Sequence, residues 1–367
     1  MKILFVVTAL QTGGAERQVV DIADHCFERG HQVKIAYLTG KQLIQPKTDD
    51  IEVLCLSMRK NLVGFVRAYL KLQRIVRSFR PDVVHSHMVH ANLLARLVRL
   101  GCSMPKLVCT AHSKNEGGWM RMLAYRVTDC LADLSTNVSV EAVEEFEKKR
   151  AVPQGKMLPI HNGIDTQRFR RSDSARDVIR AQEGVCDDEK VVLAVGRLTE
   201  AKDYFNLFRA FNVLSNAGQY ARLWIIGDGE LRESLENEVN SYYWAGKVSF
   251  YRFQKEIAAW INAADVFVLS SAWEGFGLVV AEAMACEKVV VATDSGGVKE
   301  VLGDAGYLVP PSDHLSLANS LNNALNISNM ERIEMGNRAR KRVIKLYSIN
   351  NIVERWLFIY SNSQKNK

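Results

Sequence analysis

Apolar segments alternate with segments of helical periodicity along almost the whole chain. The first half contains the apolar runs ILFVV, QVKIAYL, VLCLS, DVVHSH and KLVCTAH, and the second half contains VVLAVGRL, RLWIIGDG, KVSFY, DVFVLSS, KVVVATDSGG and GYLVP. Strands that read as continuous Val, Ile and Leu runs are typical of parallel sheets covered by helices on both faces. The alternation therefore predicts an α/β fold built from doubly wound parallel sheets.

The length and the distribution of polar residues predict two domains. The chain has 367 residues, and domains usually contain about 100–200 residues. The segment 163–190 is polar and rich in turn-forming residues, beginning with GIDTQRFRRSDSARD. We expect a hinge in this segment, with one domain over 1–163 and a second over 164–347.

Cysteine usage and hydropathy exclude several classes of protein. The seven cysteines are scattered and never spaced CxxC, which argues against a disulfide framework or a structural zinc site and favours a reducing compartment. The start MKILFVVTAL lacks an A-x-A cleavage site and is better interpreted as a buried first strand than as a signal peptide. The chain contains no run of about 18 apolar residues that could span a membrane.

The formal net charge of +7 is concentrated in the first half of the chain. Residues 59–80, RKNLVGFVRAYLKLQRIVRSFR, contain seven cations and no acidic residue. Apolar or long side chains recur there at helical spacing, at Leu62, Val66, Tyr69, Leu72 or Gln73, Val76 and Phe79. The pattern predicts a basic amphipathic helix, whose apolar stripe either packs on the sheet or faces an anionic membrane. Nucleic acid is the other partner that such a charge excess suggests.

Four loops follow predicted strands and carry polar or glycine residues: LQTGGAER, TAHSKNEGG, GRLTEAKD and AWEGFGL. Ligands of doubly wound sheets bind outside the carboxyl ends of the strands, so two domains presenting these edges to each other would form a cleft. Gly13 and Gly14 open a helix after the first strand, where exposed amides and the helix dipole suit an anion. The alternative is a simple strand–helix turn, and the dinucleotide fingerprint GxGxxG is absent.

Arg197 and Lys202 follow the first strand of the second half. Lys202 is expected near the positive end of a helix dipole, which is locally unfavourable, and local rules are often broken at functional sites. A guanidinium and an ammonium together would clamp a diphosphate. The alternative is a pair of solvated surface cations.

The stretch SAWEGFGLVVAEAMA places Glu274 in a glycine-rich loop and Glu282 inside the following helix. The helix is expected to start near Leu278, so the amides of Phe276, Gly277 and Leu278 would be available to an anion or a sugar hydroxyl. Glu282 could accept hydrogen bonds from a diol such as a ribose, and Glu274 would serve the other end of the same ligand. The alternative is that Glu282 caps its helix and Glu274 is solvated. Burial of a charge without partners is costly, which favours the functional interpretation.

His112 ends the strand KLVCTAH, where a histidine in a cleft could donate a hydrogen bond or accept a proton. A histidine held by the backbone is the alternative. His85, His87 and His90 lack metal-ligand partners at convincing spacing, and we interpret them as structural.

Taken together, the motifs are similar to those of the retaining GT-B glycosyltransferases of family 4. They are GGAER near the start, HNGID at 161–165, GRLTEAKD at 196–203, GDGELRESLE at 227–236, and EGFGLVVAEAMA at 274–285 followed by GGVKEV. The resemblance implies two Rossmann-like domains facing a central cleft, with the nucleotide-sugar donor held mainly by the second. It also implies that a C-terminal helix, at about 348–367, completes the first domain.

The resemblance further implies roles for the candidate site residues. Arg197 and Lys202 would contact the donor diphosphate, and Gly13 and Gly14 would close over the phosphates from the first domain. His112 would be a catalytic residue near the reacting carbon.

Glu274 would bind the transferred sugar as the other catalytic residue, and Glu282 would bind the ribose. The amides of Phe276, Gly277 and Leu278 would hold sugar and phosphate groups. Phe253 and Gln254 would contact a uracil base, although the chain has Arg252 where many relatives have a glycine.

These expectations define a reaction. The enzyme would transfer a hexose or N-acetylhexosamine, with retention, from a nucleotide diphosphate sugar such as a UDP-sugar. The acceptor would be a lipid-linked saccharide in the synthesis of a surface polysaccharide such as O-antigen, capsule or lipopolysaccharide. We expect no metal or other cofactor, and a peripheral location on the cytoplasmic membrane face through residues 59–80.

Three alternatives remain open at this stage. A nucleotide-sugar epimerase of the same architecture would form product without an acceptor. A glycosidase would require its two carboxyl groups about 5–5.5 Å apart across one bond, whereas Glu274 and Glu282 are expected at separate ends of the ligand. A nucleic-acid binder would use the basic half, but the sequence lacks aromatic interleaving or a recognisable module.

Overall fold

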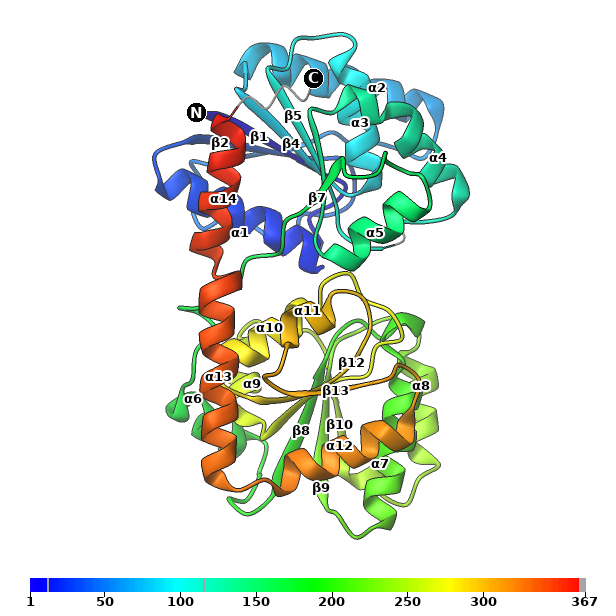
Figure 1. Cartoon of the computed structure of the whole chain (residues 1–367), viewed down its shortest axis with the longest axis vertical. Coiled ribbons are helices and arrows are strands. Elements are labelled where there is room, and N and C mark those ends of the chain that lie inside the picture. Colours follow the sequence, from blue (N-terminus) through cyan, green and yellow to red (C-terminus); the bar gives the residue numbers. More distant parts are fainter. Residues whose placement is uncertain (12, 115, 363–367) are drawn as a thin grey trace. The chain divides into compact units, whose positions relative to one another are not determined.

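The computed structural model describes residues 1–11, 13–114 and 116–362. It consists of two compact units (Figure 1). The first unit contains Met1–Gly163 and the C-terminal segment that begins at Ile349, and the second contains Ile164–Ser348. In the described part of the chain, no helix has both the length and the apolar character needed to cross a bilayer.

The first unit is built on a seven-stranded sheet of order β3-β2-β1-β4-β5-β6-β7. All neighbouring strands are parallel. Its strands are β1 (Lys2–Val7), β2 (Gln32–Tyr37), β3 (Glu52–Cys55), β4 (Val83–His87), β5 (Lys106–Ala111), β6 (Leu134–Asn137) and β7 (Met157–Pro159). The strand order reverses between β1 and β4, and such a switch point is where doubly wound sheets bind ligands.

Helices cover both faces of this sheet (Figure 1). They are α1 (Gly14–Glu28), α2 (Leu62–Phe79), α3 (Val89–Arg99), α4 (Trp119–Thr128), α5 (Val140–Lys148) and α14 (Ile349–Ser361). One apolar core joins α1 and α14 to one face of the sheet, with Val353 and Trp356 of α14 buried in it. A second core packs α2 and α3 on the opposite face.

The second unit has a six-stranded sheet of order β10-β9-β8-β11-β12-β13, again parallel throughout. Its strands are β8 (Lys190–Val195), β9 (Ala221–Ile226), β10 (Val248–Tyr251), β11 (Val266–Leu269), β12 (Val289–Thr293) and β13 (Tyr307–Val309). The strand order reverses between β8 and β11. The structure thus confirms the fold class that the apolar alternation predicted.

The helices of the second unit are α6 (Asp173–Gln182), α7 (Tyr204–Asn216), α8 (Arg232–Asn240), α9 (Ile257–Ala263), α10 (Leu278–Ala285), α11 (Val298–Leu302), α12 (His314–Asn326) and α13 (Asn329–Tyr347). The core on one face of the sheet includes side chains of α7, α8 and α12. The long helix α13 begins with a capping box formed by Ser328 and Glu331, which satisfies amides of its first turn.

The structure adds detail to two expectations about local structure. The segment 163–190 is not only a turn-rich hinge, because it contains α6, which packs against α9. Only the second half of the apolar stripe predicted for residues 59–80 is buried. Leu72, Val76 and Phe79 pack inside the unit, whereas Leu62 and Val66 are exposed. Gly64 and Ala68 take the buried positions in the first turns of α2.

Candidate functional site

The loops that follow β8, β9, β11 and β12 meet at the carboxyl edge of the second sheet. Backbone hydrogen bonds join them: the amide of Leu198 donates to the carbonyl of Asp228 at 3.0 Å, and the amide of Ala272 donates to the carbonyl of Ala201 at 2.9 Å. This edge lies at the switch point between β8 and β11, so the fold brings the expected donor-binding loops together.

Two glycines permit this close approach of the loops. Gly227 has φ +157°, and a Cβ there would lie 1.9 Å from the carbonyl oxygen of Gly196. Gly296 has φ +60°, and a Cβ there would lie 2.1 Å from the carbonyl oxygen of Glu274. Because any side chain would collide with backbone at both positions, glycine is what permits these loops to approach each other so closely.

Lys202 and Glu274 lie side by side at this edge and form an ion pair. The hydroxyl of Ser271 donates to the same carboxylate oxygen at 2.9 Å. Both charged side chains are largely buried, with exposed fractions of 17% and 15%. The aliphatic part of Lys202 covers Gly196, where a Cβ would lie 2.9 Å from Cε of the lysine. Lys202 ends a 3₁₀ turn over Glu200–Lys202, close to the positive end of the α7 dipole, which disfavours a cation. The carboxylate of Glu274 compensates for this unfavourable position.

Tyr204 is a component of this site that the sequence analysis missed. Its side chain is buried, and its hydroxyl donates to the carbonyl of Gly196 at 3.2 Å. Burial, and secondarily the charge of Glu274, raise the pKa of this phenol, so it remains a neutral hydrogen-bond donor. In the sequence, Tyr204 directly follows the GRLTEAKD motif. This adjacency is the signal from which its place in the site could have been predicted.

The remaining candidates in the second unit occupy the surrounding loops and α10. Arg197 is exposed in the loop that also holds Lys202. Helix α10 starts at Leu278, as predicted, after Gly277 with φ +82°, and Glu282 lies in its second turn. The ring of Phe276 packs on Tyr347 at a centroid distance of 5.5 Å, which leaves the backbone of Phe276 as the part that could contact a ligand.

Phe253 and Gln254 follow β10, two strands away from β8 on the same edge of the sheet. The ring of Phe253 is exposed. The side-chain amide of Gln254 donates to the backbone carbonyl of Arg252 at 3.3 Å. These residues therefore lie at the carboxyl edge with the others, and their contact with a base stays a prediction.

Gly13 precedes α1 in the first unit and is covered by Glu16. A Cβ at Gly13 would lie 2.2 Å from Oε2 of Glu16, whose side chain is buried. The start of α1, with Gly14 exposed, therefore already faces a carboxylate. A phosphate at this helix end would have to displace Glu16, because two anions would compete for the same dipole. The neighbouring Thr12 of the quoted loop lies outside the described residues.

His112 belongs to a row of histidines at the carboxyl ends of β4 and β5. Its Nε2 lies 3.0 Å from Nδ1 of His87, and the rings of His87 and His85 are 4.0 Å apart. Burial lowers the pKa of His112 to about 4. The imidazole is therefore neutral near physiological pH and acts through hydrogen bonds, not as a cation.

Further polar groups hold His112 in place. Its backbone amide donates to Glu116 at 2.9 Å. The hydroxyl of Tyr125 donates to the other carboxylate oxygen of Glu116 and accepts from Asn92 at 2.9 Å. Across the described residues, no group of three or more His, Cys, Asp or Glu side chains is arranged to hold a metal ion.

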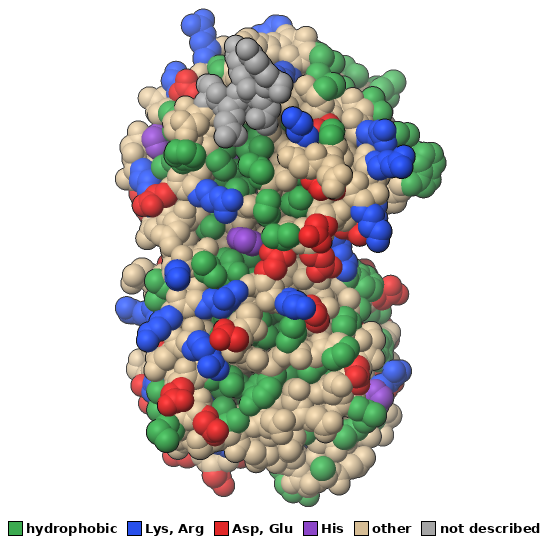
Figure 2. Space-filling model, in the orientation of Figure 1, with side chains coloured by type: hydrophobic (Ala, Val, Ile, Leu, Met, Phe, Trp, Pro, Cys, Tyr) green, Lys and Arg blue, Asp and Glu red, His purple; other side chains and the backbone are tan. Residues whose placement is uncertain are grey.

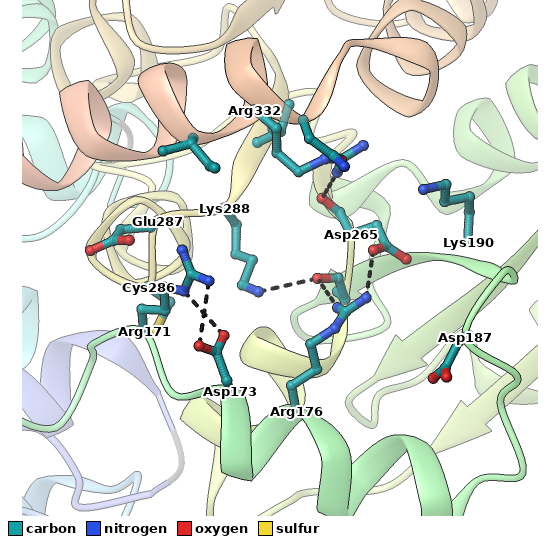
Figure 3. Close-up of a pocket in the computed structure, with 14 residues that line it drawn as sticks. Arg171, Asp173, Arg176, Asp187, Lys190, Asp265, Cys286, Glu287, Lys288 and Arg332 are labelled. Carbon is teal, nitrogen blue, oxygen red and sulfur yellow. Dashed lines mark hydrogen bonds and ion pairs between the residues drawn. The ribbon is translucent and has the colours of Figure 1, made fainter.

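A charged cavity of about 370 Å³ lies elsewhere in the second unit, next to the first residues of β8 and β12 (Figure 3). The two cations at its centre already have partners: Arg176 pairs with Asp265 at 2.8 Å, and Lys288 donates to the carbonyls of Asn262 at 2.7 Å and Ala264 at 3.3 Å. These contacts cap the C-terminus of α9, so we interpret the cavity as structural.

Lys288 provides a test of this structural interpretation. Burial, with a smaller effect of Arg176, lowers its pKa from 10.5 to about 8, so between these values the unfolded chain binds a proton that the folded unit has released. Unfolding free energy is therefore expected to rise with pH across this window, by at most about 3 kcal/mol. Urea unfolding at both ends of the window, for the wild type and Lys288→Met, measures the effect. A variant that follows the wild-type pH dependence would contradict the assignment.

Comparisons of the sequence and of the structure with known proteins agree, because both find glycosyltransferases. Residues 175–342 match the family Glycosyl transferases group 1, and residues 12–168 match Glycosyltransferase Family 4. An uncharacterized glycosyltransferase of Methanocaldococcus jannaschii is 31% identical over 76% of this chain and 75% of its own. A GalNAc-α-(1->4)-GalNAc-α-(1->3)-diNAcBac-PP-undecaprenol α-1,4-N-acetyl-D-galactosaminyltransferase of Campylobacter jejuni is 26% identical over 97% of both chains. The structure of Anabaena HepE in complex with UDP-glucose superimposes with a TM-score of 0.86 at 22% identity, over 98% of this chain and 99% of that chain.

Proposed function

The chain belongs to the family 4 glycosyltransferases, with a GT-B fold, and from that premise we propose its reaction. It transfers a hexose or N-acetylhexosamine, with retention, from a UDP-sugar to a lipid-linked saccharide during the synthesis of a surface polysaccharide. Lipid-linked acceptors occur in the printed names of the Campylobacter relative and of an Escherichia coli galactosyltransferase. Those relatives are transferases, and nothing in them supports the epimerase alternative.

The observation that supports this proposal is the juxtaposition of Lys202 and Glu274 at the switch point of the second sheet. Cleavage of a sugar–phosphate bond develops negative charge on the leaving diphosphate and positive charge on the sugar ring. Lys202, with Arg197 from the same loop, stabilises the diphosphate, and Glu274 binds the sugar beside it. An adjacent cation and carboxylate match this pair of developing charges.

The other candidates complete the proposed binding mode. Glu282 accepts hydrogen bonds from the ribose, the amides of Phe276, Gly277 and Leu278 hold the sugar and phosphate groups, and Phe253 and Gln254 contact the base. Gly13 and Gly14 approach the phosphates once Glu16 has moved away from the start of α1. The neutral imidazole of His112 donates or accepts a hydrogen bond at the transferred sugar. Arg197 and Lys202 would neutralise the diphosphate charge that a metal ion neutralises in other transferases. We therefore propose a metal-independent reaction.

We also propose that the enzyme works at the cytoplasmic face of the membrane, where a lipid-linked acceptor would be available. The exposed cations of α2, Arg67, Lys71, Arg74 and Arg77, would attract anionic lipid headgroups. Each basic residue near such a surface contributes about 1 kcal/mol to binding.

A thermal-shift screen against nucleotide diphosphate sugars tests the donor assignment. A ligand present at about 100 times its dissociation constant adds about 2.7 kcal/mol to the stability of the folded protein. We expect the largest increase in Tm with one UDP-sugar and a smaller one with UDP, without added metal. If no nucleotide sugar raises Tm, or if chelation of metal ions removes the shift, the corresponding part of the proposal is wrong.

A further inference from the structure

Helix α4 exposes an unusual number of large apolar side chains. Its ten residues bury only Met122 and Tyr125, while Trp119 and Met120 have exposed fractions of 75% and 68%. Leu123 and Val127 are exposed on the same helix. In Figure 2, hydrophobic side chains gather beside Lys and Arg at the edge of the unit where Figure 1 draws α4. Contiguous exposed apolar surface of this kind marks a binding surface more often than a solvated one.

The first turns of α2 show the same feature. Leu62 and Val63 are 78% and 60% exposed, and Val66 follows at 46%. These side chains are free to contact a partner because Gly64 and Ala68 fill the inward positions. Helix α2 therefore uses two different apolar faces: its second half packs on the sheet, and its first half is presented to the outside.

The two exposed groups lie at the same edge of the first unit. Helices of a parallel sheet run back from the carboxyl ends of the strands, so the first turns of α2 and α4 lie at the edge that also holds His112. Helix α3 contacts both helices. At the first turn of α3, the charges of Arg121 and Lys60 both contribute to lowering the pKa of His90, although burial contributes most. The beginnings of the three helices thus form one surface.

This surface, which we call the apolar–basic face, comprises Leu62, Val63, Val66, Trp119, Met120 and Leu123 with the adjacent cations. Helices α2, α3 and α4 contain no Asp or Glu. Apolar side chains flanked by cations without acidic residues fit the headgroup region of an anionic bilayer, where Trp is favoured. The same charges disfavour pairing with a second copy, because a symmetric contact would place like charges opposite each other.

We propose that the apolar–basic face inserts into an anionic bilayer, with Trp119 and Met120 entering the headgroup and acyl boundary and the cations of α2 contacting lipid headgroups. This inference rests on the proposed function, because it places the edge with His112 against the surface that carries a lipid-linked acceptor. It goes beyond attraction by the basic helix alone: α4, which the sequence analysis did not single out, provides the apolar anchor.

Co-sedimentation of the full chain with vesicles tests the proposal. The vesicles contain phosphatidylglycerol and phosphatidylethanolamine, with pure phosphatidylcholine for comparison. We expect binding to the anionic vesicles, and a loss of affinity of about tenfold or more for the double variant Trp119→Ser/Met120→Ser. The matched control is Tyr220→Ser/Met330→Ser in the second unit, where both side chains are 71% exposed. This control should bind as the wild type does.

A second variant separates the apolar from the electrostatic contribution. Replacing Arg67, Lys71, Arg74 and Arg77 with Glu should weaken binding to anionic vesicles. Added salt should no longer weaken the binding that remains, because it now screens repulsion instead of attraction. In addition, lipids with brominated acyl chains should quench the part of the fluorescence that disappears in Trp119→Phe. Quenching requires Trp119 itself to reach the acyl boundary, so it reports insertion even if the double variant folds poorly.

Three results would overturn the proposal: absence of wild-type binding, equal binding of the α4 variant and its control, or loss of a concentration-dependent dimer in the α4 variant with unchanged vesicle binding. The nucleotide-sugar thermal shift should be the same in all folded variants. If the wild type shows the thermal shift but does not bind vesicles, only the proposed membrane insertion of the apolar–basic face is wrong. If the wild type shows no thermal shift, the proposed function is wrong.

Discussion

Lys202→Met is expected to lower kcat/KM for sugar transfer by about 10²–10³-fold, the usual effect of removing one group that stabilises charge in a transition state. The ammonium lies next to Glu274 at the edge of the second sheet, where the leaving diphosphate would gain negative charge. The effect should appear mainly in kcat, because the charge on the diphosphate increases as the bond breaks. Steady-state kinetics with the donor identified by thermal shift measures it.

An ion pair that serves only stability is the competing explanation, and a double variant distinguishes the two. Lys202→Met leaves the carboxylate of Glu274 largely buried with Ser271 as its remaining described side-chain donor, and we expect a stability loss of about 1–3 kcal/mol. Adding Glu274→Gln removes the unpaired charge and should restore most of this stability. Activity should stay low in the double variant, because neither the cation nor the carboxylate is present. Recovery of activity together with stability would show that the pair is structural.

The pair formed by Arg222 and Glu189 is a suitable control. It also lies in the second unit, its atoms are 2.8 Å apart, and its side chains are 27% and 26% exposed. Both residues are near the amino ends of β8 and β9, away from the candidate site. Glu189→Gln is therefore expected to change stability slightly and to leave kcat/KM at the wild-type value.

Much of the fold was predictable because parallel sheets impose a strong pattern on the sequence. Strands buried on both faces must be apolar throughout, and this requirement made most of the strands recognisable. Strand β7, with only three residues, and strand β6, whose four residues LSTN are mostly polar, carry too little of the pattern. The polar segment 163–190 concealed α6, because arginines of α6 are held by carbonyls at the C-terminus of α9, a contact that the local sequence does not reveal.

The candidate site was predictable where loops follow strands in order. Lys202 and Glu274 are 72 positions apart, and their proximity follows from the rule that loops at a switch point converge. Their direct pairing and the role of Tyr204 depend on side-chain packing, so they required the structure. The exposed face of α4 also required it, since a helix with apolar residues on nearly all sides gives no periodic signal for which side is buried.

The histidine row in the first unit leads to the second large prediction. We expect the first unit to lose stability as pH falls below about 6.5, the ordinary pKa of histidine. Burial lowers the pKa values of His85, His87 and His112 in the folded unit. Between pH 6.5 and the folded-state value of about 4 for His112, the unfolded chain binds protons that the folded unit excludes. Stability therefore falls with pH, by up to about 1.4 kcal/mol per pH unit for each histidine.

The groups around the row do not cancel this effect. His85 lies against neutral partners, with Nδ1 2.6 Å from the hydroxyl of Tyr360 and Nε2 2.7 Å from that of Thr110. Glu116, beside His112, has a pKa raised mainly by burial, so its protonation in the folded unit adds stability on acidification. One such carboxyl offsets at most one of the three histidines, and the net change with falling pH remains destabilising.

Substitution of His87 isolates one part of the predicted acid sensitivity. Its Nε2 is buried and has no hydrogen-bond partner among the described residues, but its Nδ1 lies 3.0 Å from Nε2 of His112. A leucine of similar size should therefore lower stability by about 1–3 kcal/mol at neutral pH, and the test is the slope of stability against pH. Urea unfolding of His87→Leu between about pH 7 and 4.5 should show a dependence on pH shallower by about 1.4 kcal/mol per unit than the wild type. His314→Asn, at the start of α12 in the second unit, should leave the dependence unchanged. If His87→Leu and the wild type lose stability equally on acidification, the three rings are not excluded from protonation by burial, and the neutral state assigned to His112 would have to be abandoned as well.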